Sequence, residues 1–264
     1  NVLADYVLAN FRLRFAPEWL ESEQQNLFAA DPTGGCGAYP VPKRHRWALR
    51  EEGGWYEYTL AEGETLLVSV FPPREYDWDT HANMRIVHDF PPLVRPGEAS
   101  RPLPTDQQLR DWRELGNVLV LHLEMWDEFC TPDKRPLDET RFARVLDLAH
   151  ELGWRVLIYS SPYFYRLRAG LPRNLTEPED YLEQLDRLLT DYPVDGIYWD
   201  GTYDDVEKAW RVARMARRRL GEMPLYIHNT RKPFHNSLVT VPFADTWADY
   251  LLRVRGMSMR DAGI

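Results

Sequence analysis

The stretch DGIYWDG at residues 195–201 constrains the fold of this chain more than any other part of the sequence. Its apolar centre predicts a short strand that ends on a carboxylate, Asp200, followed by a glycine. Helical patterns flank the stretch at residues 180–192 and 204–220. In β/α barrels the catalytic groups lie at the carboxyl ends of the strands. The stretch therefore indicates an enzyme of the α/β class, with Asp200 as the first candidate residue.

Strand patterns alternate with helix patterns from residue 84 onward, which is typical of a parallel sheet built from βαβ units. Besides the Asp200 strand, the predicted strands are residues 84–88, 117–123, 155–160, 225–228 and 238–243, and the other helices are residues 105–115 and 138–152. Because a closed barrel needs eight strands, six predict a (β/α)8 TIM-type barrel that is incomplete at its C-terminal end. Residues 253–264 are expected to form a loop or a partial helix.

The first part of the chain has a different pattern. Its predicted elements are a strand at residues 11–15, a helix at 17–30, a Gly/Pro-rich loop at 31–42, and strands at 55–60 and 65–71 joined across 62–64. The last of these strands could also be a seventh strand of the barrel sheet. We therefore expect a β-rich segment over residues 1–64 and the barrel over residues 65–264.

Composition excludes several classes of function. The net charge of −9 argues against a nucleic-acid partner, since phosphate binding needs a basic surface. No apolar stretch is long enough to predict a membrane span. The ten Trp and fourteen Tyr residues could form core or supply flat faces that stack on sugars. Cys36 and Cys130 lie far apart and show no metal-ligand spacing, and neither they nor the first residues indicate a compartment.

Polar residues gather where the predicted strands end. Side chains alternate between the two faces of a strand, so His122, Glu124 and Trp126 would share the inner face of theirs. The same alternation turns Asp200 and His228 inward. Three neighbouring strands would thus deliver polar groups to one mouth of the barrel.

Each of these residues also has a purely structural interpretation. His122 could be a core histidine, and Glu124 could lie beyond its strand in solvent. His228 and Asn229 could cap the next loop. Asp200 could cap a helix or a turn before Gly201.

Two segments resemble the clan D glycoside hydrolases, the α-galactosidase group. They are DLAHELGWRVLIYS at residues 147–160 and PVDGIYWD at residues 193–200. The resemblance covers roughly residues 138–250 and implies a distant relative with a (β/α)8 catalytic domain. It implies that Asp200 is the catalytic nucleophile at the end of the fourth strand. The acid/base of the family is an aspartate after the sixth strand, which points to Asp245.

The chain departs from the family pattern at several positions. Tyr198 stands where the family has a lysine two residues before the nucleophile, and Gly201 replaces a polar residue. A first-strand tryptophan and its paired aspartates have no clear match, although Asp77 and Trp78 could serve if residues 65–71 open the barrel.

Glycoside hydrolysis uses two carboxyl groups, one ionised and one protonated. We expect Asp200 to be the nucleophile of a retaining enzyme and Asp245 its acid/base, with Asp249 and Glu124 as substitutes for the second role. The expected partner is an oligosaccharide or glycoside substrate, with no cofactor and no metal. The residues expected to contact the sugar are His122, Trp126, Tyr159, His228, Asn229, Asp77, Trp78 and Trp247.

Other functions remain open from the sequence. His122, Glu124, His228 and Asp200 could surround a metal ion in a different hydrolase. The barrel could instead bind carbohydrate without cleaving it, or serve a purely structural role. A homo-oligomer, an additional domain or a second chain could complete the barrel.

Overall fold

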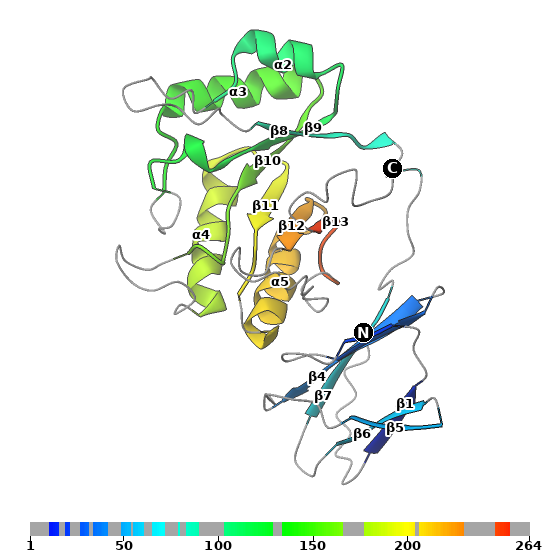
Figure 1. The fold of residues 1–264 in the computed structure, drawn as a ribbon. Coiled ribbons are helices and arrows are strands. Elements are labelled where there is room, and N and C mark those ends of the chain that lie inside the picture. Colours follow the sequence, from blue (N-terminus) through cyan, green and yellow to red (C-terminus); the bar gives the residue numbers. More distant parts are fainter. Residues whose placement is uncertain are drawn as a thin grey trace, which may run out of the picture. The chain divides into compact units, whose positions relative to one another are not determined.

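The computed structural model divides the chain into two compact units, Asn1–Tyr76 and Asp77–Ile264 (Figure 1). The structure describes residues 11–15, 19–21, 27–31, 34–41, 49–53, 55–60, 65–71, 79, 83–89, 103–128, 134–165, 177–203, 206–229 and 246–253. Within these residues, no helix has the length and apolar character needed to cross a membrane.

The first unit contains two antiparallel sheets. One has the strand order β1-β6-β5, and the other has the order β2-β3-β4-β7. The strands are β1 (Phe11–Phe15), β2 (Trp19–Glu21), β3 (Leu27–Asp31), β4 (Gly34–Val41), β5 (Leu49–Glu52), β6 (Trp55–Leu60) and β7 (Thr65–Phe71). The strands predicted at residues 11–15, 55–60 and 65–71 are therefore confirmed.

Two secondary-structure predictions for this unit are wrong. The segment predicted as a helix at residues 17–30 contains β2 and most of β3, and most of the predicted loop at 31–42 is β4. The glycine-rich β4 pairs with β3 on one side and β7 on the other, and these two ladders override its low strand propensity. Because β7 pairs with β4, it belongs to this unit and not to the barrel. The unit boundary consequently follows Tyr76, later than the boundary expected after residue 64.

The second unit is an open half-barrel of six parallel strands in the order β13-β12-β11-β10-β9-β8 (Figure 1). The strands are β8 (Ile86–Asp89), β9 (Val118–Leu121), β10 (Arg155–Tyr159), β11 (Gly196–Asp200), β12 (Leu225–Asn229) and β13 (Tyr250–Arg253). The predicted partial TIM-type barrel is thus confirmed. The sixth strand is β13, whereas the segment predicted for it, residues 238–243, lies outside the described residues.

Between these strands, the described residues form the following α-helices and a 3-10 helix. They are α2 (Asp106–Trp112), η1 (Leu123–Met125), α3 (Glu139–Glu151), α4 (Pro178–Asp191) and α5 (Val206–Leu220). Side chains at their first turns define where two of them begin. Thr105 and Gln108 form a capping box at α2, and the Asp138 carboxylate accepts from the backbone of Arg141 at α3.

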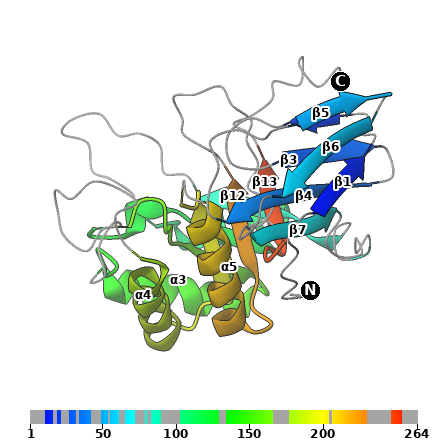
Figure 2. The same cartoon turned by 90° about the horizontal axis from the view of Figure 1, so that it is seen from below.

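One face of the sheet packs under the helices. The strand residues on this face are fully buried, among them Leu119, Ile158, Ile197, Trp199 and Ile227. The indole N–H of Trp199 donates to the hydroxyl of Tyr181 on α4 at 2.6 Å, so Trp199 points outward. Burying one large aliphatic side chain of this kind contributes about 1.5–3 kcal/mol to stability. The helices α4 and α5 lie side by side (Figures 1 and 2), and ion pairs such as Lys208–Glu177 join them.

The same two hydrogen bonds join neighbouring strands at their amino ends in three places: β8 with β9, β10 with β11, and β12 with β13. Asp195, just before β11, donates its backbone N–H to the carbonyl of Val156 and accepts the N–H of Val156 on its carboxylate at 2.7 Å. Asp249, just before β13, does the same with Leu225 at 2.8 Å. Asn117, just before β9, does so with Arg85 at 2.9 Å.

Candidate active site

Asp200 is the last residue of β11, the fourth strand of the half-barrel. Hydrogen bonds from both neighbouring strands fix the peptide group that joins Asp200 to Gly201. Ser161, just after β10, donates its hydroxyl to the carbonyl oxygen of Asp200 at 2.7 Å, and Gly201 donates its N–H to the carbonyl of His228 on β12 at 2.8 Å. Gly201 has a φ of 87°, which only glycine adopts without strain. The carboxylate of Asp200 is therefore presented from a rigid strand end, with its side chain 31% exposed.

His228 lies beside Asp200 on the inner face. The two residues are register partners in the β11–β12 ladder, and Nδ1 of His228 is 3.1 Å from Oδ1 of Asp200. The same Nδ1 atom is 3.2 Å from the hydroxyl oxygen of Tyr198, two residues earlier on β11. Both side chains point inward, as predicted, and they contact each other.

The inner face below these residues is filled by aromatic rings and histidines. Tyr198 is the centre of this layer, with ring centroids 5.2 Å from His88, 5.1 Å from His122, 6.0 Å from Tyr159 and 4.9 Å from Tyr226. Nδ1 of His88 lies 2.8 Å from Nε2 of His122, and its Nε2 lies 3.2 Å from the hydroxyl of Tyr226. The layer is a packed, hydrogen-bonded core.

Burial keeps this layer uncharged. It lowers the pKa of His88 to about 4 and that of His122 to about 3. It also raises the pKa of Tyr226 to about 12. The pKa of Tyr198 is raised by burial and then by the nearby charge of Asp200. At neutral pH these four groups are therefore neutral imidazoles and phenols.

His122 and Tyr159 were both expected to contact a sugar, but the structure buries them in this layer. His122 is 5% exposed and Tyr159 is 1% exposed. His122 is thus the core histidine of the alternative interpretation, with another histidine as its partner. The prediction overlooked His88 and Tyr226, which the alternation of inward side chains along their own strands could have found.

Glu124 lies in η1, beyond the end of β9. Burial raises the pKa of its carboxyl group, and the nearby charge of Asp89 at the end of β8 raises it further. Its Oε2 atom is buried and has no hydrogen-bond partner among the described residues. Glu124 therefore holds its proton to higher pH than an ordinary glutamate, as a general acid must. Asp89 was not among the predicted site residues, although it ends a strand just as Asp200 does.

Trp126 is not placed for contact with a substrate, contrary to its predicted role. The strand β9 ends at Leu121 and the chain turns into η1, so the alternation of faces does not extend to this residue. Trp126 is 4% exposed, and its indole N–H donates to the carbonyl of Tyr159 at 2.9 Å. Its ring packs against Phe142 of α3. Trp126 is a core residue.

Asp249 lies at the wrong end of the sheet for the acid/base role that was its alternative assignment. Its carboxylate accepts from the backbone of Leu225 and from the side chain of Arg217, at the amino ends of β12 and β13. Asp200 lies at the carboxyl ends. Trp247, two residues before Asp249, also precedes the amino end of β13, and its indole nitrogen is buried without a hydrogen-bond partner among the described residues.

The remaining predicted residues lie outside what the structure describes. They are Asp245, Asp77 and Trp78, together with the side chain of Asn229. In the described part of the chain, no three His, Cys, Asp or Glu side chains come together in a way that could hold a metal ion. The metal-assisted alternative around His122, Glu124, His228 and Asp200 therefore gains no support from the geometry.

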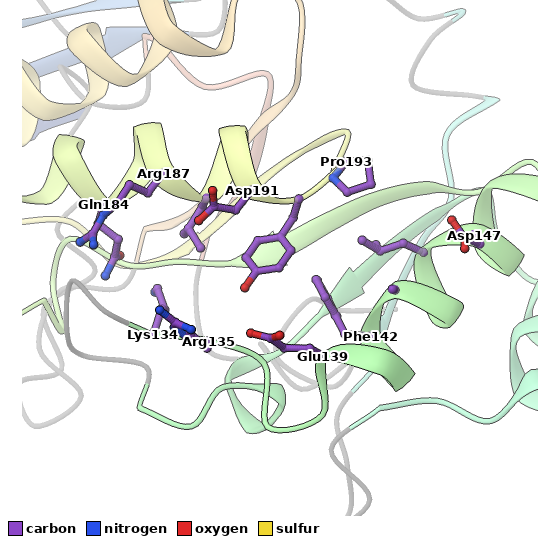
Figure 3. Close-up of a pocket in the computed structure, with 13 residues that line it drawn as sticks. Lys134, Arg135, Glu139, Phe142, Asp147, Gln184, Arg187, Asp191 and Pro193 are labelled. Atoms are coloured by element: carbon purple, nitrogen blue, oxygen red, sulfur yellow. The ribbon is translucent and has the colours of Figure 1, made fainter.

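A pocket of about 520 Å³ opens between α3 and α4 (Figure 3). Its lining includes Glu139 and Phe142 from α3 and Gln184 and Arg187 from α4. These helices cover the outer face of the sheet, whereas Asp200 and His228 lie on the inner face. The pocket is therefore separate from the candidate active site.

No protein-family profile and no curated protein sequence matches the chain. Solved structures of α-galactosidases do match. The enzyme from Thermus thermophilus in complex with stachyose is 14% identical, with a TM-score of 0.51, over 87% of this chain and 58% of the other. The same enzyme with p-nitrophenyl α-D-galactopyranoside is 12% identical, with a TM-score of 0.49, over 86% of this chain and 55% of the other.

A GH36 α-galactosidase variant from Geobacillus stearothermophilus in complex with 1-deoxygalactonojirimycin is 12% identical, with a TM-score of 0.42, over 85% of this chain and 44% of the other. The chain thus spans less than two thirds of the length of the enzymes that it matches. This chain has the partial TIM-barrel fold of the clan D α-galactosidase catalytic domains.

Proposed function

We propose that this chain is a glycoside hydrolase of the retaining type, with Asp200 as its nucleophile. The observation that carries the proposal is the place of Asp200 at the carboxyl end of the fourth parallel strand, on a sheet with the α-galactosidase fold. A strand end held by both neighbours keeps a nucleophile within the narrow range of productive geometry. The contact with His228 holds one carboxylate oxygen and leaves the other for attack on the anomeric carbon.

The second carboxyl group is proposed to be Asp245, on the strength of the sequence resemblance, with Glu124 as its alternative. The raised pKa of Glu124 supports the alternative, because a general acid must be protonated at the working pH. Asp249 is no longer a candidate, since its carboxylate binds the amino end of β12.

The test is a screen of aryl α- and β-glycosides and oligosaccharides with the wild type and Asp200→Asn. The screen includes stachyose and p-nitrophenyl α-D-galactopyranoside, the ligands of the Thermus enzyme. We expect Asp200→Asn to lower kcat about 10⁴-fold or more on any substrate that the wild type cleaves. A wild type that cleaves none of these compounds contradicts the proposal.

The same variants identify the acid. Removing a general acid slows the departure of a poor leaving group more than that of a good one. Asp245→Asn and Glu124→Gln are therefore compared on aryl glycosides of differing leaving-group pKa. The variant whose loss grows with leaving-group pKa marks the acid/base.

A carbohydrate-binding barrel without catalysis is the second candidate. It is favoured by Tyr198, a neutral phenol where the family resemblance implies a lysine beside the nucleophile. In that case a saccharide binds the wild type and Asp200→Asn with similar affinity in calorimetry, and neither protein cleaves it.

A further inference from the structure

Three side chains meet at the carboxyl end of β11. Nδ1 of His228 is 3.1 Å from Oδ1 of Asp200 and 3.2 Å from the hydroxyl of Tyr198. The Tyr198 and His228 rings are nearly parallel, with an interplanar angle of 22°. Every residue of this group belongs to β11 or β12, so their relative positions are fixed by the ladder that joins the two strands.

The surroundings of His228 determine which of its ring nitrogens carries the proton. An ionised carboxylate can only accept a hydrogen bond, so the contact with Asp200 requires the proton on Nδ1. The Nε2 atom of His228 is buried and has no hydrogen-bond partner among the described residues. In the other tautomer Nδ1 could accept from the Tyr198 hydroxyl, but its lone pair would also face the carboxylate and an unpartnered N–H would be buried on Nε2, which costs more free energy. The geometry therefore favours the Nδ1–H tautomer.

Tyr198 contacts the His228 ring from the interior side of the inner layer. The phenol ring is 2% exposed, and four other rings of the inner layer contact it. It therefore has little freedom to turn, and its hydroxyl stays next to Nδ1. The raised pKa of Tyr198 keeps that hydroxyl protonated, so the phenol does not compete with Asp200 as a nucleophile.

We propose, on the basis of the function proposed above, that His228 is the positioning residue of Asp200. Its Nδ1–H donates to Oδ1 and fixes the direction of the carboxylate, while Tyr198 fixes the plane of the imidazole. His228 acts through Asp200 and does not itself react with the substrate.

The test compares three replacements of His228 on a glycoside that the wild type cleaves. The amide nitrogen of asparagine can reach the place of Nδ1, whereas that of glutamine reaches the place of Nε2. We expect His228→Ala and His228→Gln to lower kcat about 100-fold with little change in KM, because a misdirected nucleophile loses rate and not binding. His228→Asn should recover most of the rate.

The matched control is His150→Ala. His150 also contacts an aspartate, Asp195, at 2.9 Å, but at the amino end of the same strand. We expect this variant to keep the wild-type kcat. Thermal unfolding of all four variants separates a loss of rate from a loss of fold.

A second measurement is independent of turnover. Nitrogen-15 NMR of the imidazole rings in the full chain, with His228 assigned through His228→Asn, reports the tautomer. We expect Nδ1–H in the wild type. An Nε2–H tautomer, a wild-type kcat in His228→Ala, or equal recovery by asparagine and glutamine overturns the proposal. If the wild type cleaves no glycoside, the proposed function fails, and the tautomer still decides whether His228 donates to Asp200.

Discussion

Asp195 and Asp249 make the same pair of hydrogen bonds at the amino ends of β11 and β13. Each donates its backbone N–H to a carbonyl oxygen at the amino end of the neighbouring strand, that of Val156 or Leu225, and accepts the N–H of the same residue on its carboxylate. Each carboxylate also contacts a basic side chain on a helix, His150 for Asp195 and Arg217 for Asp249. Asn117 makes the same backbone pair with its amide oxygen. These residues join the six strands into three pairs, at the end of the sheet opposite the candidate active site.

The first prediction concerns the hydrogen bonds that Asp195 makes with Val156. Asp195→Ala leaves the N–H of Val156 without its acceptor, and we expect it to lower the free energy of unfolding by about 1–3 kcal/mol. Asp195→Asn should cost much less, because Asn117 shows that an amide oxygen serves in the same place. Urea denaturation measures both, with Asp147→Ala on the exposed side of α3 as the control. Equal losses in the alanine and asparagine variants would show that the charge, and not the acceptor, matters.

The inward orientation of Asp200 and His228 could be predicted because it follows from local rules. Both residues lie within strands, and the alternation of side chains decides which face they occupy. Asp249 shows where this reasoning stops. A carboxylate next to a strand can serve either end of the sheet, and residues 244–249 contain no signal for which end. Only the hydrogen bonds to Leu225 reveal that Asp249 belongs to the amino ends.

Trp126 and β4 show the two other reasons for wrong predictions. The strand before Trp126 ends at Leu121, two residues earlier than predicted, and a 3-10 turn then redirects the Trp126 side chain into the core. The strand β4 pairs with β7, which is distant in the sequence, and local strand propensity cannot reveal that pairing.

The second prediction concerns the turn after Asp200. Gly201 has a φ of 87°, so Gly201→Ala should cost about 1–2 kcal/mol of stability. Its N–H donates to the carbonyl of His228, and a strained turn would shift Asp200 as well. We therefore expect a loss of kcat in addition to the loss of stability.

Gly221 provides the control for that prediction. It has a φ of 58°, an added Cβ meets nothing within 4 Å, and it follows α5, away from Asp200. Gly221→Ala should cost similar stability and leave kcat unchanged. If both variants lose kcat alike, the effect on Gly201 is one of global stability and not of the position of Asp200.

The third prediction concerns the stability of the fold at low pH. Hydrogen bonds from Arg144 and then Arg141 of α3 lower the pKa of Asp106, at the start of α2, to about 2. Because the folded pKa lies below the ordinary value of 3.8, this group stabilises the fold above that value and loses the effect as the pH falls toward 2. Asp106→Asn should therefore flatten the loss of stability between about pH 4 and 2. Asp111→Asn, which neutralises a carboxylate that accepts from the neutral Gln107 amide, should keep the wild-type slope.

The fourth prediction concerns Glu124, whose pKa is raised by burial and by Asp89. A carboxyl group with a raised folded pKa contributes fully to stability below the unfolded value of 4.5 and loses that contribution as the pH rises through the folded value. Glu124→Gln removes the buried charge, so we expect the variant to gain stability relative to the wild type on going from pH 4 to pH 8. Denaturation at the two pH values measures the gain, and Glu114→Gln, at an exposed position, should show none.

The activity of Glu124→Gln shows whether the carboxyl group of Glu124, which lowers stability at high pH, is needed for catalysis. If Glu124 is the acid, Glu124→Gln becomes more stable at pH 8 and at the same time loses the cleavage of substrates with poor leaving groups. If Asp245 is the acid, the variant gains stability and keeps its rate. One oxygen of the Glu124 carboxyl group is buried without a hydrogen-bond partner among the described residues, and such groups concentrate at functional sites, which keeps Glu124 as the alternative acid. Because Asp245 is the proposed acid, we expect the second outcome, and a Glu124→Gln variant whose loss of rate grows with leaving-group pKa contradicts it.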